Sequence, residues 1–262
     1  MKQLILLILI FPIYTYTQIT PSGVGVTQSA AWMAIGIHQK IYNKEQETKW
    51  TSESVIALGR MSYPNKINTF KRPSIFTIRQ DFKYSIGSQL NISIGINYYT
   101  KYNYESTYPY HQKAIPFKHE IKTSSGIAYD IPIHFLTITP SLKQEFSQYF
   151  NPNFSYYTEQ FRARTRARVK LKFNLTKDKK HAVILISEQL FSSTKQFIST
   201  KWSPFLYKDS RFSIYYSHTF TKQSIQLDIG YMHHLVGYYK PSSIHHFAID
   251  IIWKNPFKSN LR

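Results

Sequence analysis

Residues 161–175, FRARTRARVKLKFNL, alternate basic and uncharged side chains, and this pattern constrains the fold more than any other part of the sequence. In a helix, at about 100° per residue, the cations would lie all around the axis and leave no apolar stripe to bury. In a β-strand, side chains alternate between two faces, so one face is basic and the other apolar. The pattern therefore predicts a strand longer than the roughly 9–11 residues that cross a bilayer. Its cations are Arg162, Arg164, Arg166, Arg168, Lys170 and Lys172.

The N-terminus predicts export. Residues 1–17, MKQLILLILIFPIYTYT, carry one Lys, an apolar run and then small residues, the pattern of a cleaved signal peptide. A buried first strand or an uncleaved anchor is the alternative. We expect residues 18–262 to form a single domain. The net charge of +19 would suit nucleic acid, but export argues against that partner.

Composition then leaves one way across a membrane. The chain has no cysteine, so no disulfide framework can form. Beyond residue 17 it has no apolar stretch of about 18 residues that would predict a transmembrane helix. A closed antiparallel β-barrel is the remaining structure that pairs all backbone groups within a bilayer.

Alternating segments and their links support this barrel. Short links alternate with long ones, as periplasmic turns and extracellular loops do in outer-membrane barrels. Residues 19–29 would supply a twelfth strand and give the even number of bacterial single-chain barrels. Alternatively, they thread the lumen and the strand count is ten. The other predicted strands cover residues 32–42, 50–62, 74–84, 90–104, 117–126, 134–149, 161–175, 181–191, 209–220, 224–235 and 245–253.

Several short stretches resemble an uncharacterised outer-membrane family, domain of unknown function 2490. They are AAWMAIGIHQKI, SLKQEFSQYF with Glu145, FRARTRARVKL, ISEQLF with Glu188, DSRFSIYYS with Arg211, and LDIGYMHH. The resemblance spans nearly all of the mature chain and implies an exported barrel in the outer membrane of a Gram-negative bacterium. It implies no activity. The chain departs from the family at Thr139 and Pro140, where a basic residue is common.

The basic ladder, Arg162 to Lys172, is expected to face the lumen. Arg or Lys on the lipid face at mid-depth would cost ~2–4 kcal/mol each. We expect carboxylates from neighbouring and facing strands to meet these cations, with a positive surplus. The expected lumen carboxylates are Glu145, Glu188, Glu120, Glu53, Asp81 and Asp228, and the further lumen cations are Arg211 and Lys143.

Two functions fit such a lumen. In the first, an Arg–carboxylate network fills and stiffens a narrow barrel, since unpaired charges would be costly there. In the second, the ladder draws small anionic solutes through an anion-selective pore. Twelve strands lie between filled barrels of eight and water-filled barrels of sixteen. We expect a monomer whose partners are outer-membrane lipid and, in the second case, small anions.

A lipid-modifying enzyme is the alternative from another class. Pairing Phe220 with Ile225 across the 221–224 turn would leave Ser210 diagonal to His233, with Asp209 adjacent. An interfacial His and a turn Ser explain the same residues without catalysis. No G-x-S-x-G nucleophile elbow occurs. We therefore assign no catalytic residue.

The sequence also predicts no metal site and no cofactor. His233–His234 and His245–His246 are adjacent pairs, and neighbours on a strand point to opposite faces, so neither pair can chelate from one face. The nucleotide and zinc-protease motifs are absent.

Overall fold

The structure is a computed structural model that describes residues 27–43, 46–237 and 241–257. Within these residues the fold is all-β, and none of their segments is a helix able to cross a membrane. The strands are β1 (Ser29–Asn43), β2 (Gln46–Met61), β3 (Arg72–Ile86), β4 (Leu90–Tyr104), β5 (Gln112–Tyr129), β6 (Ile131–Ile133), β7 (Leu136–Phe150), β8 (Tyr156–Asn174), β9 (His181–Gln196), β10 (Leu206–Phe220), β11 (Ile225–Val236) and β12 (Ser242–Lys254).

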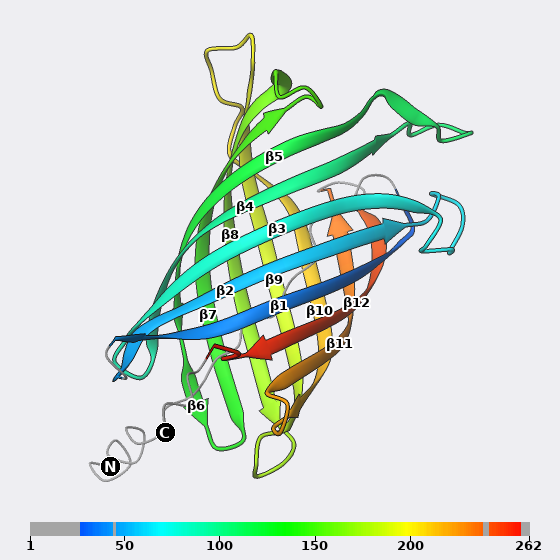
Figure 1. Cartoon of the computed structure of the whole chain (residues 1–262). Coiled ribbons are helices and arrows are strands. Elements are labelled where there is room, and N and C mark those ends of the chain that lie inside the picture. The colour runs from blue at the N-terminus through cyan, green and yellow to red at the C-terminus, as the bar shows by residue number, and fades with distance from the viewer. Residues whose placement is uncertain (1–26, 44–45, 238–240, 258–262) are drawn as a thin grey trace.

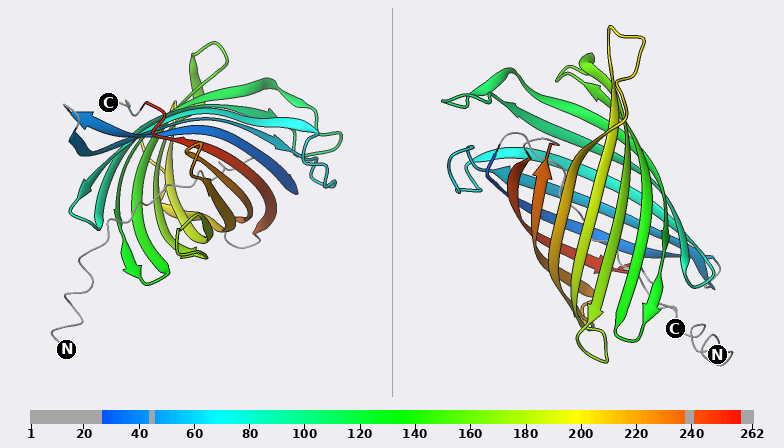
Figure 2. Two further views of the ribbon diagram at one scale, coloured as in Figure 1. Left: turned by 60° about the horizontal axis from the view of Figure 1, so that its bottom comes forward. Right: turned by 180° about the vertical axis from the view of Figure 1, so that it is seen from behind.

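The sheet closes into a barrel (Figures 1 and 2). Consecutive long strands pair antiparallel, and β5 pairs with β7 past the short β6. The closing pair is different: β1 and β12 run parallel, with Ser29 opposite His245 and His38 opposite Lys254. The wall has eleven long strands because β6 only extends the β5–β7 connection. With an odd number of alternating strands, the first and last point the same way and must pair in parallel.

The predicted barrel of twelve strands is confirmed, but its twelfth strand is not the expected one. That strand is β6, with the sequence Ile-Pro-Ile, which lies in the link between the predicted strands at 117–126 and 134–149. Of the predicted strand at 19–29, residues 19–26 lie outside the described residues. Thr27 and Gln28 precede β1 and are not part of a strand.

The connections form two distinct ends. At the short-turn end lie the links 87–89, 130–135, 175–180 and 221–224. At the long-loop end lie the links 62–71, 105–111, 151–155 and 197–205, beyond which several hairpins project (Figure 1). Two of the predicted long loops are shorter than expected because β5 and β8 each begin five residues earlier, at Gln112 and Tyr156.

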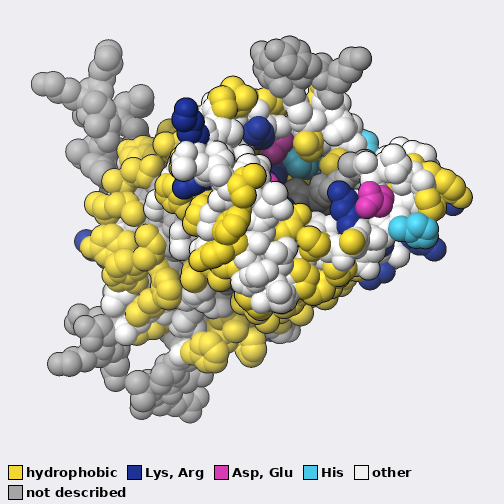
Figure 3. Space-filling view, turned by 90° about the horizontal axis from the view of Figure 1, so that it is seen from above, with side chains coloured by type: hydrophobic (Ala, Val, Ile, Leu, Met, Phe, Trp, Pro, Cys, Tyr) yellow, Lys and Arg dark blue, Asp and Glu magenta, His cyan; other side chains and the backbone are white. Residues whose placement is uncertain are grey.

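Alternation along each strand separates the two faces of the wall. On β4, Asn91 and Asn97 are buried in the interior, whereas Ile92, Ile94 and Ile96 are exposed on the outside. The same period-two pattern produces a band of exposed aliphatic and aromatic side chains around the barrel. Seen from the long-loop end, hydrophobic side chains cover much of the visible outer wall, and charged and His side chains are visible both in the central hollow and on a projecting part of the molecule (Figure 3).

A buried apolar cluster crosses the interior. Tyr99 on β4 and Tyr215 on β10 belong to it, and these strands lie opposite one another in the ring. Both rings are almost completely buried, so apolar packing fills this part of the barrel. The cluster comprises Trp32, Ala34, Val55, Ala57, Ile75, Tyr99, Ala182, Ile184, Ile186, Tyr215 and Ala248.

Candidate functional site: the charged interior

The basic ladder lies on β8, between β7 and β9, and the strand register determines which carboxylates it meets. Glu145 on β7 is opposite Arg164, and Glu188 on β9 is opposite Arg168. Directly opposed residues in a sheet project their side chains to the same face. Both carboxylates therefore lie among the cations of β8.

These contacts form a continuous chain of ion pairs. Glu145 lies 3.6 Å from Arg164 and 3.2 Å from Arg166, and Lys122 approaches it at 3.7 Å. Arg166 also contacts Glu188 at 3.2 Å, so one guanidinium bridges the two carboxylates. Multiple charge-assisted contacts of this kind hold neighbouring strands in one geometry.

Glu188, like Glu145, contacts three cations. It has no exposed surface and meets Arg166, Arg168 at 2.6 Å and Arg211 at 3.7 Å. Arg211 in turn donates to Asp209 at 3.1 Å. The chain of ion pairs thus extends from Lys122 on β5 to Arg211 and Asp209 on β10.

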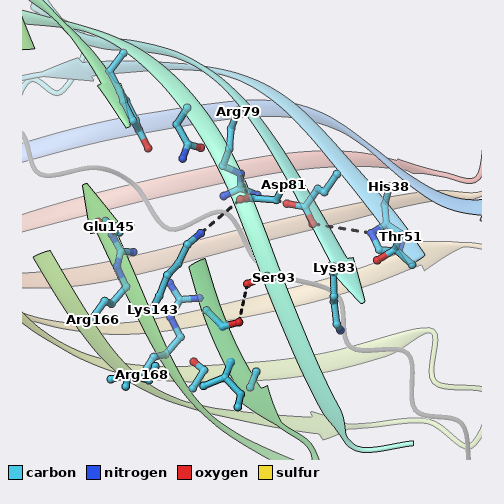
Figure 4. A pocket seen from close by; sticks show the side chains of 18 residues that line it. His38, Thr51, Arg79, Asp81, Lys83, Ser93, Lys143, Glu145, Arg166 and Arg168 are labelled. Atoms are coloured by element: carbon cyan, nitrogen blue, oxygen red, sulfur yellow. Dashed lines mark hydrogen bonds and ion pairs between the residues drawn. The ribbon is translucent and has the colours of Figure 1, made fainter. Parts of the chain in front are cut away.

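A second group of ion pairs crosses the interior (Figure 4). Arg79 on β3 contacts Glu53, and its Nε atom lies 2.9 Å from Asp81. Lys143 on β7 reaches Asp81 at 3.5 Å. Because β4 and β5 separate β3 from β7 in the wall, the Lys143–Asp81 pair links non-adjacent strands.

The other predicted interior residues are placed as follows. Glu120 is buried, pairs with Lys101 and accepts a hydrogen bond of 2.6 Å from Ser147. Asp228 is buried and accepts two hydrogen bonds of 2.8 Å from the Gln226 amide.

The contacts of the basic ladder differ between the two ends of β8. Arg162 pairs with Glu159 on the same strand at 2.6 Å, near the long-loop end. Lys170, close to the other end of β8, is buried, and Lys172 follows it in the same phase. The four arginines of the ladder therefore all meet carboxylates.

A small cavity remains beside the two groups of ion pairs (Figure 4). Its volume is about 160 Å³, and charged side chains of both signs line it, including Arg79, Asp81, Lys143, Arg166 and Arg168. At roughly 30 Å³ per water molecule, such a volume suits a few waters or one small anion.

Two further interior carboxylates were not identified from the sequence. Asp130 is buried and accepts hydrogen bonds from Asn91 at 2.8 Å and Thr139 at 2.6 Å. Asp250 is buried and accepts from the Trp32 indole at 3.1 Å. The inward phase of β5 continues to Asp130, so alternation could have identified it, although the sequence analysis left it in the link between the strands predicted at 117–126 and 134–149.

Ser210 and His233 form hydrogen bonds with other residues and not with each other. The predicted pairing of Phe220 with Ile225 is confirmed, and in the same register Phe212 lies opposite His233. Ser210, however, donates to Gln189 at 2.6 Å and shares a hydrogen bond of 2.7 Å with Tyr207. The His233 Nε2 atom lies 2.6 Å from the hydroxyl of Ser243.

The fold and its interior define a class of protein: a closed β-barrel of long strands whose interior is filled by apolar packing and charge pairs. A family model described as protein of unknown function (DUF2490) matches residues 30–242, and the chain belongs to this family. This match confirms the resemblance noted in the sequence. No curated protein matches the chain.

Proposed function

We propose that the protein is a monomeric outer-membrane barrel with a structural role, whose interior is closed to bulk solute flow by its ion pairs and apolar cluster. The observation that carries this proposal is the Lys143–Asp81 pair, which spans the interior between non-adjacent strands. A barrel that served as a wide pore would leave this path open.

The outer surface supports a membrane location. Ile35 and Leu58 are 68% and 57% exposed on the outside, and exposed apolar side chains recur on most strands. Water would disfavour such a band, whereas lipid accommodates it. The strands are also long enough to span a bilayer, since β8 alone has 19 residues.

The ion pairs of the interior support a barrel that is closed to bulk solute flow. Each arginine of the ladder meets a carboxylate, and each such pair offsets the cost of removing charge from water. The pairs also join β7 to β10 laterally, which stiffens the wall. A barrel of this kind is closed by its own side chains and needs no plug domain. Its long loops are then the part that faces the solvent.

Slow passage of small anions is a second candidate, favoured by the cavity. Its lining includes Arg79, Lys143, Arg166 and Arg168 together with Lys83. An anion that displaced one carboxylate contact would find several guanidinium and ammonium donors within reach.

Single-channel recording in planar bilayers under a KCl gradient tests both candidates. We expect the refolded wild-type protein to give no steps or very small ones. The double variant Lys143→Ala/Asp81→Ala should give larger steps, because it removes the link across the interior without leaving a lone charge.

The matched control is Lys180→Ala/Asp178→Ala, which removes an exposed ion pair of 2.8 Å at the short-turn end. It should behave like the wild type. Large wild-type steps equal to those of the Lys143/Asp81 variant would contradict closure. Small anion-selective wild-type steps that lose their selectivity in Arg166→Gln would establish the second candidate. Heat-modifiable migration on gels verifies that each variant is folded.

A further inference from the structure

A row of directly opposed residues crosses the inner face of the wall beside the charged cavity. Directly opposed residues project to the same face, and all members of this row line the cavity of about 160 Å³ (Figure 4). The row therefore has one cation at its β3 end, two cations at its β7 and β8 end, and two small residues between them. In order, it consists of Lys83, Ser93, Gly126, Lys143 and Arg166.

The next row towards the short-turn end continues this arrangement. Ala128 lies opposite Ser141, and Ser141 lies opposite Arg168. These three residues also line the cavity. Small side chains thus form the floor of the cavity across β4, β5 and β7, whereas long cationic side chains rise on both sides of it.

The lining of the cavity carries a positive surplus. Asp81 and Glu145 lie two residues from Lys83 and Lys143 along β3 and β7, on the long-loop side, and Glu53 is opposite Asp81. The carboxylates therefore border one side of the cavity, and the floor lies among cations. With His38 neutral, five cations against three carboxylates leave a formal surplus of two positive charges. The charged lining residues are Arg79, Lys83, Lys143, Arg166 and Arg168, and Glu53, Asp81 and Glu145.

The ion pairs of these cations leave capacity for a further anion. The Lys143 ammonium lies 3.5 Å from Asp81, which is longer than the 2.7–2.9 Å of a charge-assisted hydrogen bond. Arg166 meets Glu145 and Glu188 through its two terminal nitrogens, and its Nε–H has no hydrogen-bond partner among the described residues. Solvent reaches this place, since the side chains of Lys143 and Asp81 are 29% and 18% exposed.

We propose that this cavity binds one small tetrahedral dianion of the phosphate class. Its two negative charges match the surplus of the lining. At roughly 30 Å³ per water molecule, the cavity has room for about five groups of that size, enough for four oxygens and one small substituent. Guanidinium and ammonium groups bind phosphate oxygens by charge-assisted hydrogen bonds. This inference goes beyond the structural role proposed above, and it does not require passage of the ion through the barrel.

Lys118 on β5 supplies a matched control. Its side chain is in phase with the buried Glu120, and its ammonium lies 4.6 Å and 4.7 Å from the ring centroids of Tyr149 and Tyr157. It lies towards the long-loop end and does not line the cavity. Lys118→Gln therefore removes the same interior charge as Lys83→Gln, but away from the proposed site.

Calorimetric titration of sodium phosphate into the refolded protein, in a buffer without phosphate, tests the proposal. We expect one ion per chain. Lys83→Gln should weaken binding at least about tenfold, because a hydrogen bond to a charged group contributes that much. Ala128→Leu should abolish binding without changing the charge, because its side chain would occupy the space above the floor. Lys118→Gln should bind phosphate like the wild type.

A parallel titration with glycerol 3-phosphate distinguishes free phosphate from a phosphate monoester. Binding of either one supports the proposal, and the tighter of the two identifies the source. Heat-modifiable migration on gels verifies that each variant is folded.

Three outcomes would overturn the proposal. They are no binding of either ion by the wild type, unchanged affinity in folded Lys83→Gln or Ala128→Leu, and an equal loss in Lys118→Gln. The last would show that the total charge of the interior, and not this cavity, attracts the ion. None of them bears on whether the barrel is closed, because conductance measures passage and calorimetry measures binding.

Discussion

Glu188 shows at the scale of one residue how this interior tolerates charge. A fully buried carboxylate would be costly alone, but here three guanidinium groups, from Arg166, Arg168 and Arg211, surround it. The stabilisation is mutual, since each arginine would also be costly without its partner. The pairs therefore depend on one another, and removing Glu188 takes a shared carboxylate from three cations at once.

Glu188→Gln should thus be strongly destabilising. The amide has nearly the same shape but no charge, so three guanidinium groups would lose a shared anionic partner, and we expect a loss of about 3–5 kcal/mol in the free energy of unfolding. Urea titration of the barrel refolded into lipid vesicles measures it.

Glu159→Gln is the matched control for that measurement. Glu159 pairs with Arg162 near the long-loop end, and its side chain is 21% exposed. Partial exposure to solvent weakens such a pair, so the loss should be under about 1 kcal/mol. Equal losses for the two variants would show that burial does not decide the contribution of these pairs.

At the scale of an element, the β8–β9 turn is organised by one carboxylate. Asp178 accepts a hydrogen bond of 2.6 Å from Thr176, and its other oxygen lies 2.8 Å from the Lys180 ammonium. These contacts, that of Lys180 first, lower the pKa of Asp178 below its ordinary value of 3.8. They close the turn and bring His181 to the start of β9.

The pH dependence of this turn follows from the sign of that shift. A lowered carboxyl pKa stabilises the turn at all pH values above the ordinary pKa, and this stabilisation is lost as the pH falls through the folded value. We expect carbon-13 NMR titration to give Asp178 an apparent pKa below 3.8, and Lys180→Ala to return it towards that value. An unshifted Asp178 in the wild type would contradict the described contacts.

At the scale of the whole molecule, the most informative feature is the seam, the parallel pair of β1 and β12 that closes the barrel. β1 and β12 pair in parallel because the wall has an odd number of long strands. The interior contacts depend on this closure, including the hydrogen bond from Trp32 on β1 to Asp250 on β12. A strand inserted between them would separate these two side chains.

Cross-linking can verify the seam directly. Met33 and Ile249 are opposite one another in the parallel register, and both side chains are exposed on the outside. Because the chain has no cysteine, Met33→Cys/Ile249→Cys should form one disulfide on mild oxidation, visible as a gel shift that reductant reverses.

The matched control for the cross-link is Met33→Cys/Phe247→Cys. Both positions face outward, but Phe247 is two residues out of register with Met33. The Met33→Cys/Phe247→Cys variant should therefore form little disulfide. Absence of a disulfide in the in-register pair would indicate another strand between β1 and β12, as the sequence-based prediction for residues 19–29 implies.

The sequence by itself determined the barrel and the phase of its strands. Alternation from Arg162 to Lys172 puts all six cations on one face of the strand and apolar side chains on the other, so the outward face of the wall is apolar only if the cations point inward. The same rule applied to β5 would have assigned Asp130 to the interior as well. Alternation is a local property of the backbone, so the sequence alone carries it.

Only the tertiary structure decided which side chains meet. Arg166 bridges Glu145 and Glu188 because of the registers of β7 and β9, and Lys143 reaches Asp81 because the barrel closes. The same holds for His181 and His218, which are 37 positions apart and meet through the β9–β10 register. Register and closure arise from the pairing of whole strands, and no local pattern of residues specifies the resulting distances.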